Sequence, residues 1–538
     1  MKLFVLSLMM LLAFFRCEKA NSETSDGVSG SVEIVQASVP LFTGQDNDKL
    51  IRLAVQTGEE NKAIEVVGVT VVFTPESDTD CLTSISAIAY EGNNELLFGS
   101  STEIGKTTQI EGSVQVSQPV QLFHLNFSVN ENVGLLSTLQ LERMDVTLSD
   151  GSVISSGPAN PHTYRLAKVL RAAGQDDCDT YRIPGLVTTN KGTLIAVYDN
   201  RYNNSKDLQE DIDVGMSRST DGGQTWEPMQ VIMDMGEWGG RSQRLNGIGD
   251  PSVLYDHTTG TLWVAGLWMS GATEKDMLWW ASKPGMSPEE TGQFIIAKST
   301  DDGLTWSEPI NITGQIKDPS WQLLLQGPGR GITLEDGTLV FPAQFKADIG
   351  EKALDGGQYT SHSTIVYSTD GGESWHIGTG AKPNTTEAQV VQLTDGSLML
   401  NMRDDQNRND KSETNGRAVA VTKDLGKTWE VHPSSNSELP EPNCMASIIS
   451  ADLKIDGHPK RVLFFSNPNN KHQRTNMTIK TSLDEGMSWP EEFQLELNET
   501  ARYGYSCMTM IDEHTIGILY EGVKELYFQS IPVSDIIK

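Results

Sequence analysis

Short stretches in which apolar and polar residues alternate run through the first third of the chain. Alternation with a period of two places every second side chain on one face of a strand, and β-branched residues favour that conformation. Turn-forming Gly, Asn, Asp and Ser separate the stretches. They cover residues 32–35, 50–55, 64–73, 85–90, 120–127 and 139–147. The pattern predicts a small β-sandwich domain over residues 25–165, either a carbohydrate-binding module or a flanking domain.

The rest of the chain carries one eight-residue pattern five times: hydroxyl, x, Asp, x, Gly, x, hydroxyl, Trp. The copies lie at 219–226, 299–306, 368–375, 422–429 and 482–489. Asp and hydroxyl side chains bond nearby backbone groups, Gly supplies a positive φ, and we expect the Trp ring to clamp its own turn. The stretch of chain between one copy of the pattern and the next is long enough for one four-stranded sheet. The fold class is therefore all-β, with a six-bladed β-propeller over residues 170–538 and one blade without the pattern.

Residues 1–20 predict an export signal. Lys2 is followed by an apolar run to Phe15 that is too short to span a bilayer. Cys17 after this run suggests a lipoprotein signal as an alternative, although Arg16 is bulky where signal cleavage favours small residues. We expect an exported, periplasmic or extracellular protein that meets a membrane only through such a lipid anchor.

The charge and the metal-binding residue types exclude several functions. The chain has 72 acidic and 41 basic side chains, which argues against nucleic-acid binding and requires a local cationic cluster for any anionic substrate. Its five cysteines form no CxxC pair, and its nine histidines show no HExxH spacing. We therefore expect no metal and no cofactor.

Just past the expected domain boundary near residue 165, and ahead of the first repeat, stands Tyr181-Arg182-Ile183-Pro184. This motif followed by the repeated Asp turns resembles the exo-sialidases, or neuraminidases, over residues 176–538. The resemblance implies an exo-α-sialidase that hydrolyses terminal sialic acid from glycoproteins, glycolipids or oligosaccharides with retention, through a tyrosyl-enzyme intermediate. A trans-sialidase and a lectin that binds sialic acid without cutting it are the alternatives.

The resemblance assigns the substrate carboxylate to three arginines, Arg182, Arg403 and Arg474. A guanidinium fork matches a carboxylate bidentately, which Lys does not do. Arg201 is similar to a further pocket arginine, and Asp250 in Gly-Asp-Pro-Ser is similar to an acidic residue that contacts C4 and the N-acyl side of the sugar.

The resemblance also implies the acid/base residue, Asp207, in the loop after the Arg-Ile-Pro strand. This carboxyl would protonate the departing oxygen and later take a proton from water. Asp211 and Asp213 are its competitors in the same loop region.

Tyr505 is similar to the family's catalytic tyrosine and is preferred over Tyr503 for that role. Glu387 is similar to the carboxylate that partners this tyrosine, and Glu521 would brace Arg182. A neutral phenol approaches an anomeric centre that bears a carboxylate without the repulsion that an anion meets. Its pKa near 10 requires a base in contact with it.

Trp279-Trp280 could line a pocket or pack blades together, and packing is the favoured interpretation.

Overall fold

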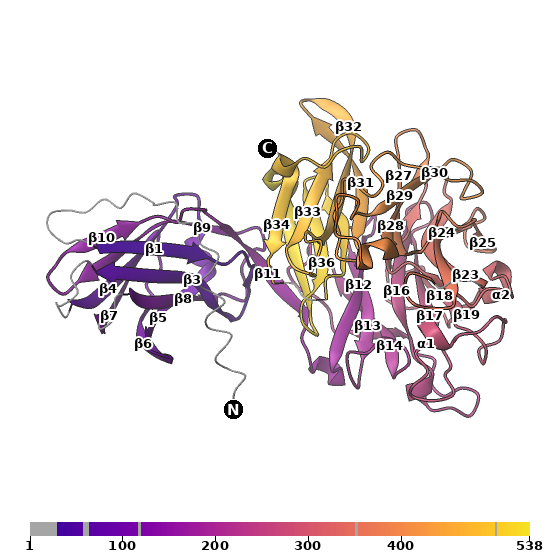
Figure 1. The fold of residues 1–538 in the computed structure, drawn as a ribbon, viewed down its shortest axis with the longest axis horizontal. Coiled ribbons are helices and arrows are strands. Elements are labelled where there is room, and N and C mark those ends of the chain that lie inside the picture. The colour runs from indigo at the N-terminus through magenta and orange to yellow at the C-terminus, as the bar shows by residue number, and fades with distance from the viewer. Residues whose placement is uncertain (1–29, 58–63, 117–119, 350–352, 501–502, 538) are drawn as a thin grey trace. The chain divides into compact units, whose positions relative to one another are not determined.

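A computed structural model of the chain describes residues 30–57, 64–116, 120–349, 353–500 and 503–537. The predicted signal at residues 1–20, including Cys17, lies outside the described residues. The chain divides into an N-terminal unit (Met1–Ala37, Gly44–Val133, Ser137–Tyr164) and a C-terminal unit (Ser38–Thr43, Gly134–Leu136, Arg165–Lys538). Strands dominate both units (Figure 1). In the described part of the chain, no helix is both long and apolar enough to cross a membrane.

Two antiparallel sheets make up the N-terminal unit. The first has the order β1 (Gly30–Gln36), β3 (Asp46–Thr57), β8 (Val120–Val129), β5 (Leu82–Glu91), β6 (Asn94–Ser101). The second contains β7 (Thr107–Val116), β4 (Ile64–Phe73), β9 (Thr138–Leu148) and β10 (Val153–Ser156). All six predicted stretches lie in these strands. The sequence did not predict β6, because its adjacent Leu96 and Leu97 are both exposed and break the alternation.

The core of the N-terminal unit lies between its sheets. Strand β8 alternates buried and less buried positions along its length, as the period of two predicts. Phe127 of β8 meets Phe73 of β4 edge to face, with ring centroids 5.9 Å apart. The two sheets therefore bury their apolar faces against each other.

The described strands of the C-terminal unit form six sheets, which follow one another along the chain. The first sheet contains β12 (Thr180–Thr188), β13 (Leu194–Arg201), β14 (Ile212–Ser219) and β15 (Gln230–Met233), and the second contains β16 (Ile248–Asp256), β17 (Thr261–Trp268), β18 (Gln293–Ser299) and β19 (Ile310–Asn311), with β21 (Gly329–Arg330) beside β16. The third contains β20 (Leu323–Gln326), β22 (Ile332–Thr333), β23 (Leu339–Ile349), β24 (Tyr359–Ser368), β25 (His376–Ile377) and β26 (Lys382–Pro383), and the fourth contains β27 (Thr385–Gln392), β28 (Leu398–Asp404), β29 (Ala418–Thr422) and β30 (Glu430–Val431). The fifth contains β31 (Ser447–Ile455), β32 (His458–Pro468), β33 (Met477–Ser482) and β34 (Gln494–Asn498), and the sixth contains β35 (Ser506–Asp512), β36 (Thr515–Glu521) and β37 (Leu526–Pro532) with β11 (Thr163–Arg171). The short β2 (Leu41–Phe42) pairs with β11, and the short helices α1 (Leu278–Ala281) and α2 (Thr313–Ile316) lie in loops.

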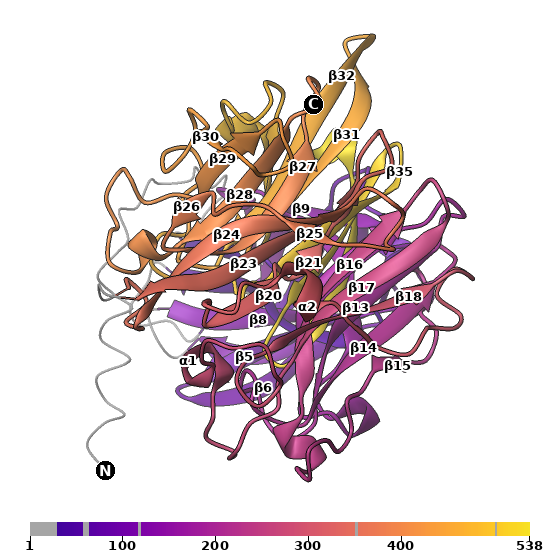
Figure 2. The ribbon, with the colours of Figure 1, turned by 90° about the vertical axis from the view of Figure 1, so that its right-hand side faces the viewer.

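Strands from successive sheets contact one another. The contacts run from β12 to β16, from β16 to β23, from β23 to β27, from β27 to β31, from β31 to β35 and from β35 back to β12. Five of these strands, β16, β23, β27, β31 and β35, are labelled in Figure 2. Strand β11 pairs with β37, so the last sheet joins a strand that precedes β12 in the chain to the end of the chain. Residues more than 300 positions apart in sequence are thus held together.

Each of the five repeats forms the same turn between the third and fourth strands of its sheet. In the first, Asp221 Oδ1 accepts hydrogen bonds from Ser219 Oγ (2.8 Å) and from Thr225 N (2.9 Å), and Ser219 Oγ accepts from Gly223 N (2.9 Å). Gly223 has φ +90°, and a Cβ there would lie 2.1 Å from the Phe528 ring. Only glycine satisfies both demands.

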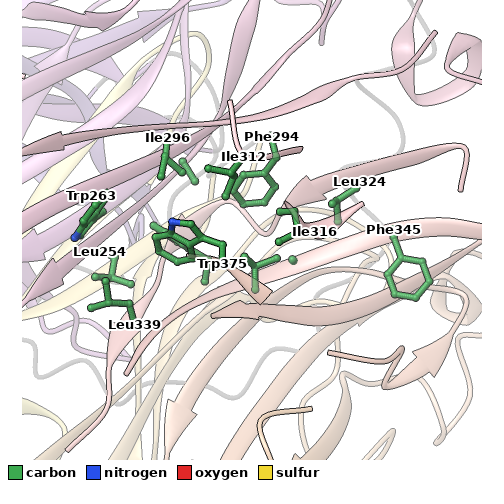
Figure 3. Close-up of a cluster of buried hydrophobic side chains, with 14 of the residues drawn as sticks. Leu254, Trp263, Phe294, Ile296, Ile312, Ile316, Leu324, Leu339, Phe345 and Trp375 are labelled. Carbon is green, nitrogen blue, oxygen red and sulfur yellow. The ribbon is translucent and has the colours of Figure 1, made fainter. Parts of the chain in front are cut away.

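The tryptophans of the repeats do more than the sequence predicts. The indole N–H of Trp226 donates to its own turn, to Gly223 O at 3.1 Å. Trp375 instead packs against Trp263 of β17, in the preceding sheet, with ring centroids 5.9 Å apart (Figure 3). The tryptophans therefore do not only clamp their own turns as predicted, because Trp375 also connects one sheet to the next.

Candidate active site

A cavity of about 270 Å³, the central cavity, opens in the C-terminal unit. Its charged and polar lining consists of Arg182, Asp207, Asp250, Gln344, Thr386, Glu387, Arg403, Arg408, Arg474 and Tyr505. Its other lining residues are Ile183, Leu208, Leu267, Met269, Met277, Trp279, Trp280, Leu323 and Leu325. Every one of the six sheets, or a loop next to it, contributes at least one of them.

Irregular backbone directs two of these side chains into the cavity. The pairing of β12 with β13 shifts register after Arg182, and that of β16 with β17 shifts after Gly249. Ile183 and Asp250 have φ values of +58° and +55°, which a β-branched residue such as Ile rarely adopts. Ile183 is held there because its N–H donates to Glu521 Oε1 at 3.0 Å. The Arg-Ile-Pro motif thus forms a bulge that directs the Arg182 side chain into the central cavity.

Three arginines far apart in sequence surround one phenol. The guanidinium carbons of Arg182 and Arg474 lie 5.2 and 5.6 Å from the centroid of the Tyr505 ring. Arg403 Nη1 donates to Tyr505 Oη at 3.2 Å. In this acidic chain the three arginines form a local cationic cluster of the kind that binds an anion.

Tyr505 and Glu387 form a hydrogen-bonded pair at the centre of this cluster. Tyr505 Oη donates to Glu387 Oε1, while Arg403 Nη1 donates to Glu387 Oε2 at 2.6 Å. Burial raises the pKa of Glu387, but the charge of Arg403 and the Tyr505 hydrogen bond outweigh it, so the pKa lies below its ordinary value. Burial and the charge of Glu387 raise the pKa of Tyr505 well above its ordinary value. The resting pair is therefore a neutral phenol on a carboxylate.

Glu521 connects Arg182 to the chain around Tyr505. It is fully buried, and its Oε1 accepts from Arg182 Nε at 3.0 Å. Its Oε2 accepts from the backbone N–H of Tyr505, also at 3.0 Å. The predicted brace of Arg182 thus also fixes the backbone of the phenol.

Asp207 lies at the cavity with its side chain 66% exposed. Its Oδ1 accepts from Arg201 Nη1 at 2.8 Å and from Arg182 Nη1 at 3.1 Å. The walls of the cavity keep part of the surrounding water away and so raise the pKa of Asp207, but the charges of Arg201 and Arg182 outweigh this and hold that pKa below its ordinary value. Arg201, predicted to touch the substrate, is 1% exposed, is not among the lining residues of the cavity, and bonds Asp199 and Asp207. In the structure Arg201 therefore contacts Asp207 and does not reach the cavity itself.

The two competing acids lie elsewhere. Asp213 is 4% exposed, accepts a hydrogen bond from Tyr202 Oη at 2.9 Å and does not line the cavity. Burial and the nearby charge of Asp234 raise the pKa of Asp213 to about 8. Asp211 does not line the cavity either. Of the three candidates only Asp207 can meet a ligand there.

Asp250 lines the cavity next to the buried carboxylate of Asp199. Its backbone N–H donates to Asp199 Oδ1 at 2.8 Å. Burial and the charges of Asp199 and Asp207 raise the pKa of Asp250 well above its ordinary value. A carboxyl in this state can donate a hydrogen bond to a neutral polar ligand group. Among the described residues, no cluster of three or more His, Cys, Asp or Glu side chains is arranged to hold a metal ion.

Comparisons with known proteins place these residues in a family. The BNR repeat-like domain family matches residues 192–518. A sialidase from Bacteroides fragilis is 48% identical over 81% of this chain and 78% of its own length. A sialidase from Micromonospora viridifaciens is 31% identical over 69% of this chain and 55% of its own. The solved structure of the Hadza microbial sialidase Hz136 is 39% identical, covers 94% of this chain and 100% of its own, and superposes with a TM-score of 0.82.

The chain belongs to the sialidase family. Membership makes it an enzyme, a glycoside hydrolase of the exo-α-sialidase class. The resemblance drawn from the Arg-Ile-Pro motif and the repeats is confirmed at the level of the family.

Sequence reasoning missed several lining residues of this sialidase. Gln344 and Thr386 line the cavity, and Gln344 Oε1 and Thr386 Oγ1 are buried with no hydrogen-bond partner among the described residues. Arg408 lines the cavity while bonding Asp405 at 2.9 Å. None of the three stands in a recognisable motif. The register of β23 and β27 brings Gln344 and Thr386 to the cavity, and the turn that follows β28 brings Arg408.

The Trp279-Trp280 pair also lines the central cavity of the sialidase, whereas the sequence favoured packing between blades. Trp279 does pack, against an apolar cluster that includes Leu208 and Leu325. Trp280, however, is 49% exposed. The prediction of packing is therefore confirmed for Trp279 and wrong for Trp280.

Proposed function

We propose that this sialidase releases terminal α-linked sialic acid from glycoproteins, glycolipids or oligosaccharides with retention, through a covalent intermediate on Tyr505. One observation supports this most strongly: three guanidinium groups and the Glu387 carboxylate converge on a single phenol. Sialic acid carries a carboxylate on its anomeric carbon, so a site that holds that anion also holds the reacting carbon over the phenol.

In the proposed first step, Tyr505 Oη attacks the anomeric carbon and its proton passes to Glu387 Oε1. The bond to the departing oxygen breaks as Asp207 gives that oxygen a proton. In the second step, water attacks the same carbon and loses a proton to Asp207. The bond to Tyr505 breaks as the water oxygen adds, and the phenol recovers its proton from Glu387. Two displacements at one carbon give net retention.

The Asp207–Arg182 ion pair bears on how the first step begins. In the free site Asp207 is ionised, because the charges of Arg201 and Arg182 hold its pKa down. An incoming carboxylate on Arg182 replaces one of these partners and adds a negative charge nearby. Both effects raise the pKa of Asp207 toward the range that a proton donor needs. Substrate binding would therefore favour the protonated form of Asp207, which the first step needs.

The cavity wall fits the rest of the sugar. Asp250, with its raised pKa, can bond the ring substituents. Leu267, Met269 and Leu325 line the cavity and offer apolar contact to an N-acyl methyl group. We propose these as the residues that distinguish sialic acid from a hexose.

The proposal extends to the architecture and location. The six sheets and the ring of contacts between their strands support a six-bladed β-propeller over residues 170–538. The two packed sheets before it support a β-sandwich over residues 25–165, for which a carbohydrate-binding role is proposed. The apolar segment at residues 1–20 supports export to the periplasm or the cell exterior, with a lipid on Cys17 as the alternative to a cleaved signal.

Turnover of 4-methylumbelliferyl α-sialoside by Tyr505→Phe tests the proposal. The variant should lose ordinary turnover, while Tyr503→Phe, which removes the neighbouring hydroxyl, should retain it. NMR of the first product should show the α-anomer. A β-anomer, or full activity of Tyr505→Phe, would contradict the mechanism. Binding without release by the native chain would favour the lectin, and sialic acid transfer to lactose in place of release would favour the trans-sialidase.

A further inference from the structure

A second cavity of about 670 Å³, the side cavity, adjoins the central cavity and takes no part in the steps proposed above. Trp280 lines both. Adjacent residues divide between them: Met269 lines the central cavity and Ser270 the side cavity, as do Leu323 and Gln322. Neighbouring positions in the chain thus face two separate spaces that share the Trp280 side chain. A ligand that extends past Trp280 would occupy both.

The wall between the cavities is held firmly. Asp355 Oδ2 accepts from Trp279 Nε1 at 2.9 Å and from Lys346 Nζ at 2.8 Å. The Lys346 ammonium lies 4.1 and 4.9 Å from the rings of Trp279 and Trp280. The side chains of Lys346 and Asp355 are each 1% exposed. A buried ion pair therefore fixes the aromatic pair, while Trp280 keeps an exposed face.

The side cavity contains buried polar atoms that lack partners. Gln322 and Ser282 are among its lining residues, and Gln322 Oε1 and Ser282 Oγ are buried with no hydrogen-bond partner among the described residues. The two residues are 5% and 3% exposed. Buried polar groups are ordinarily hydrogen-bonded, so these two atoms call for a hydroxyl-bearing ligand or water. A wall of Trp280 and Tyr359 beside them suits a ligand with both apolar faces and hydroxyl groups.

The charges of the side cavity select against an acidic ligand. Its acidic residues Asp276, Glu289 and Glu290 outnumber Lys283 and Lys346, and the ammonium of Lys346 is already paired. A second sialic acid would meet net repulsion there. The cavity is also more than twice the volume of the central one, which exceeds what a substituent on a single sugar would fill.

We propose that the side cavity is a subsite for neutral sugars of the aglycone, the glycan to which the departing sialic acid is attached. This inference rests on the proposed function. Trp280 is the shared wall along which the glycan passes, and Gln322 and Ser282 accept hydrogen bonds from its hydroxyl groups. The site would make the enzyme prefer sialic acid at the end of an extended neutral glycan.

The test compares kcat/KM on methyl α-sialoside, whose aglycone is one carbon, with a sialylated glycan that carries four neutral sugars. The double variant Ser282→Ala/Gln322→Ala should lose about tenfold on the long glycan and stay within about twofold on the methyl glycoside. Ser530→Ala is the matched control, because Ser530 Oγ is likewise buried without a partner among the described residues and lines neither cavity. It should leave both substrates within about twofold.

Equal losses on both substrates, or no loss on either, would overturn the subsite while leaving the proposed function intact. Failure of the native enzyme to cleave methyl α-sialoside would instead overturn the proposed function and this inference with it. Saturation-transfer NMR of the native enzyme with the asialo glycan needs no variant. Transfer to sugars beyond the first supports the subsite, and its absence, or preferred cleavage of α2,8-linked oligosialic acid, overturns it.

Discussion

Replacement of Glu387 by Gln isolates the base that the mechanism requires. The substitution keeps the size and shape of the side chain but removes its charge and its ability to take the proton of Tyr505. Glu387 Oε1 now accepts from Tyr505 Oη, and its Oε2 accepts from Arg403 Nη1 at 2.6 Å. Both bonds lose their charge-assisted strength in the variant.

The expected effect on catalysis is large. A positioned general base contributes about 10²–10⁴ in rate, which is about 2.7–5.4 kcal/mol of transition-state stabilisation. The kcat of Glu387→Gln should fall by that factor. KM should change far less, because Arg182 and Arg474 remain at the cavity. Breaking the Arg403–Glu387 pair, whose side chains are 13% and 15% exposed, should also cost about 3 kcal/mol of folding free energy, the lower end for buried pairs.

Kinetics on 4-methylumbelliferyl α-sialoside and urea unfolding measure the two effects separately. Glu441→Gln is the matched control, because Glu441 pairs with Arg417 at 2.9 Å, both are buried, and neither lines the central cavity. It should lose stability to a similar or greater degree while kcat stays within about tenfold of the native value. A kcat of Glu387→Gln within tenfold of native, or an equal kcat loss in the control, would refute the role of Glu387 as the base.

Three further predictions follow from the geometry. Asp207→Ala should lose about 10²–10⁴ in kcat/KM on a sialoside with a sugar leaving group but much less on the 4-nitrophenyl sialoside, whose phenolate departs unprotonated; equal losses would contradict the acid role. Arg474→Lys should raise KM at least about tenfold with unchanged unfolding, because an ammonium cannot replace the fork; an unaltered KM would count against it. Hydrogen bonds from Thr305 lower the pKa of Asp301 from 3.8 to about 2, so its stabilisation of the fold is present above 3.8 and lost as the pH falls toward 2. The Tm gap between the native chain and Asp301→Asn should close over that range, and a gap that persists at pH 2 would show the reasoning wrong.

The all-β class followed from the sequence because strands and turns leave local signatures. Alternation marked β8, and Ser219, Asp221 and Gly223 marked a turn whose hydrogen bonds are all local. Strand β6 was not predicted, because its adjacent residues Leu96 and Leu97 are both exposed and so do not alternate in burial. The pairing of Trp375 with Trp263 was not predicted either, since it depends on how two sheets pack.

The site was predictable where it coincided with motifs. Arg182 and Tyr505 were found through the short patterns around them, and the structure brings both to one cavity. Gln344 and Thr386 carry no local signal, because the register of β23 and β27 decides what they face. The position of Arg201 behind Asp207 is likewise a matter of burial, which a motif does not encode.

Covalent trapping identifies the residue that carries the sugar in the intermediate. A 2,3-difluoro sialic acid slows breakdown of the intermediate, so the sugar should accumulate on the enzyme and be located by peptide mass spectrometry. We expect one adduct on Tyr505, and none on the Tyr505→Phe variant. An adduct on Glu387 or Asp207, or continued turnover with an unmodified Tyr505, would contradict it.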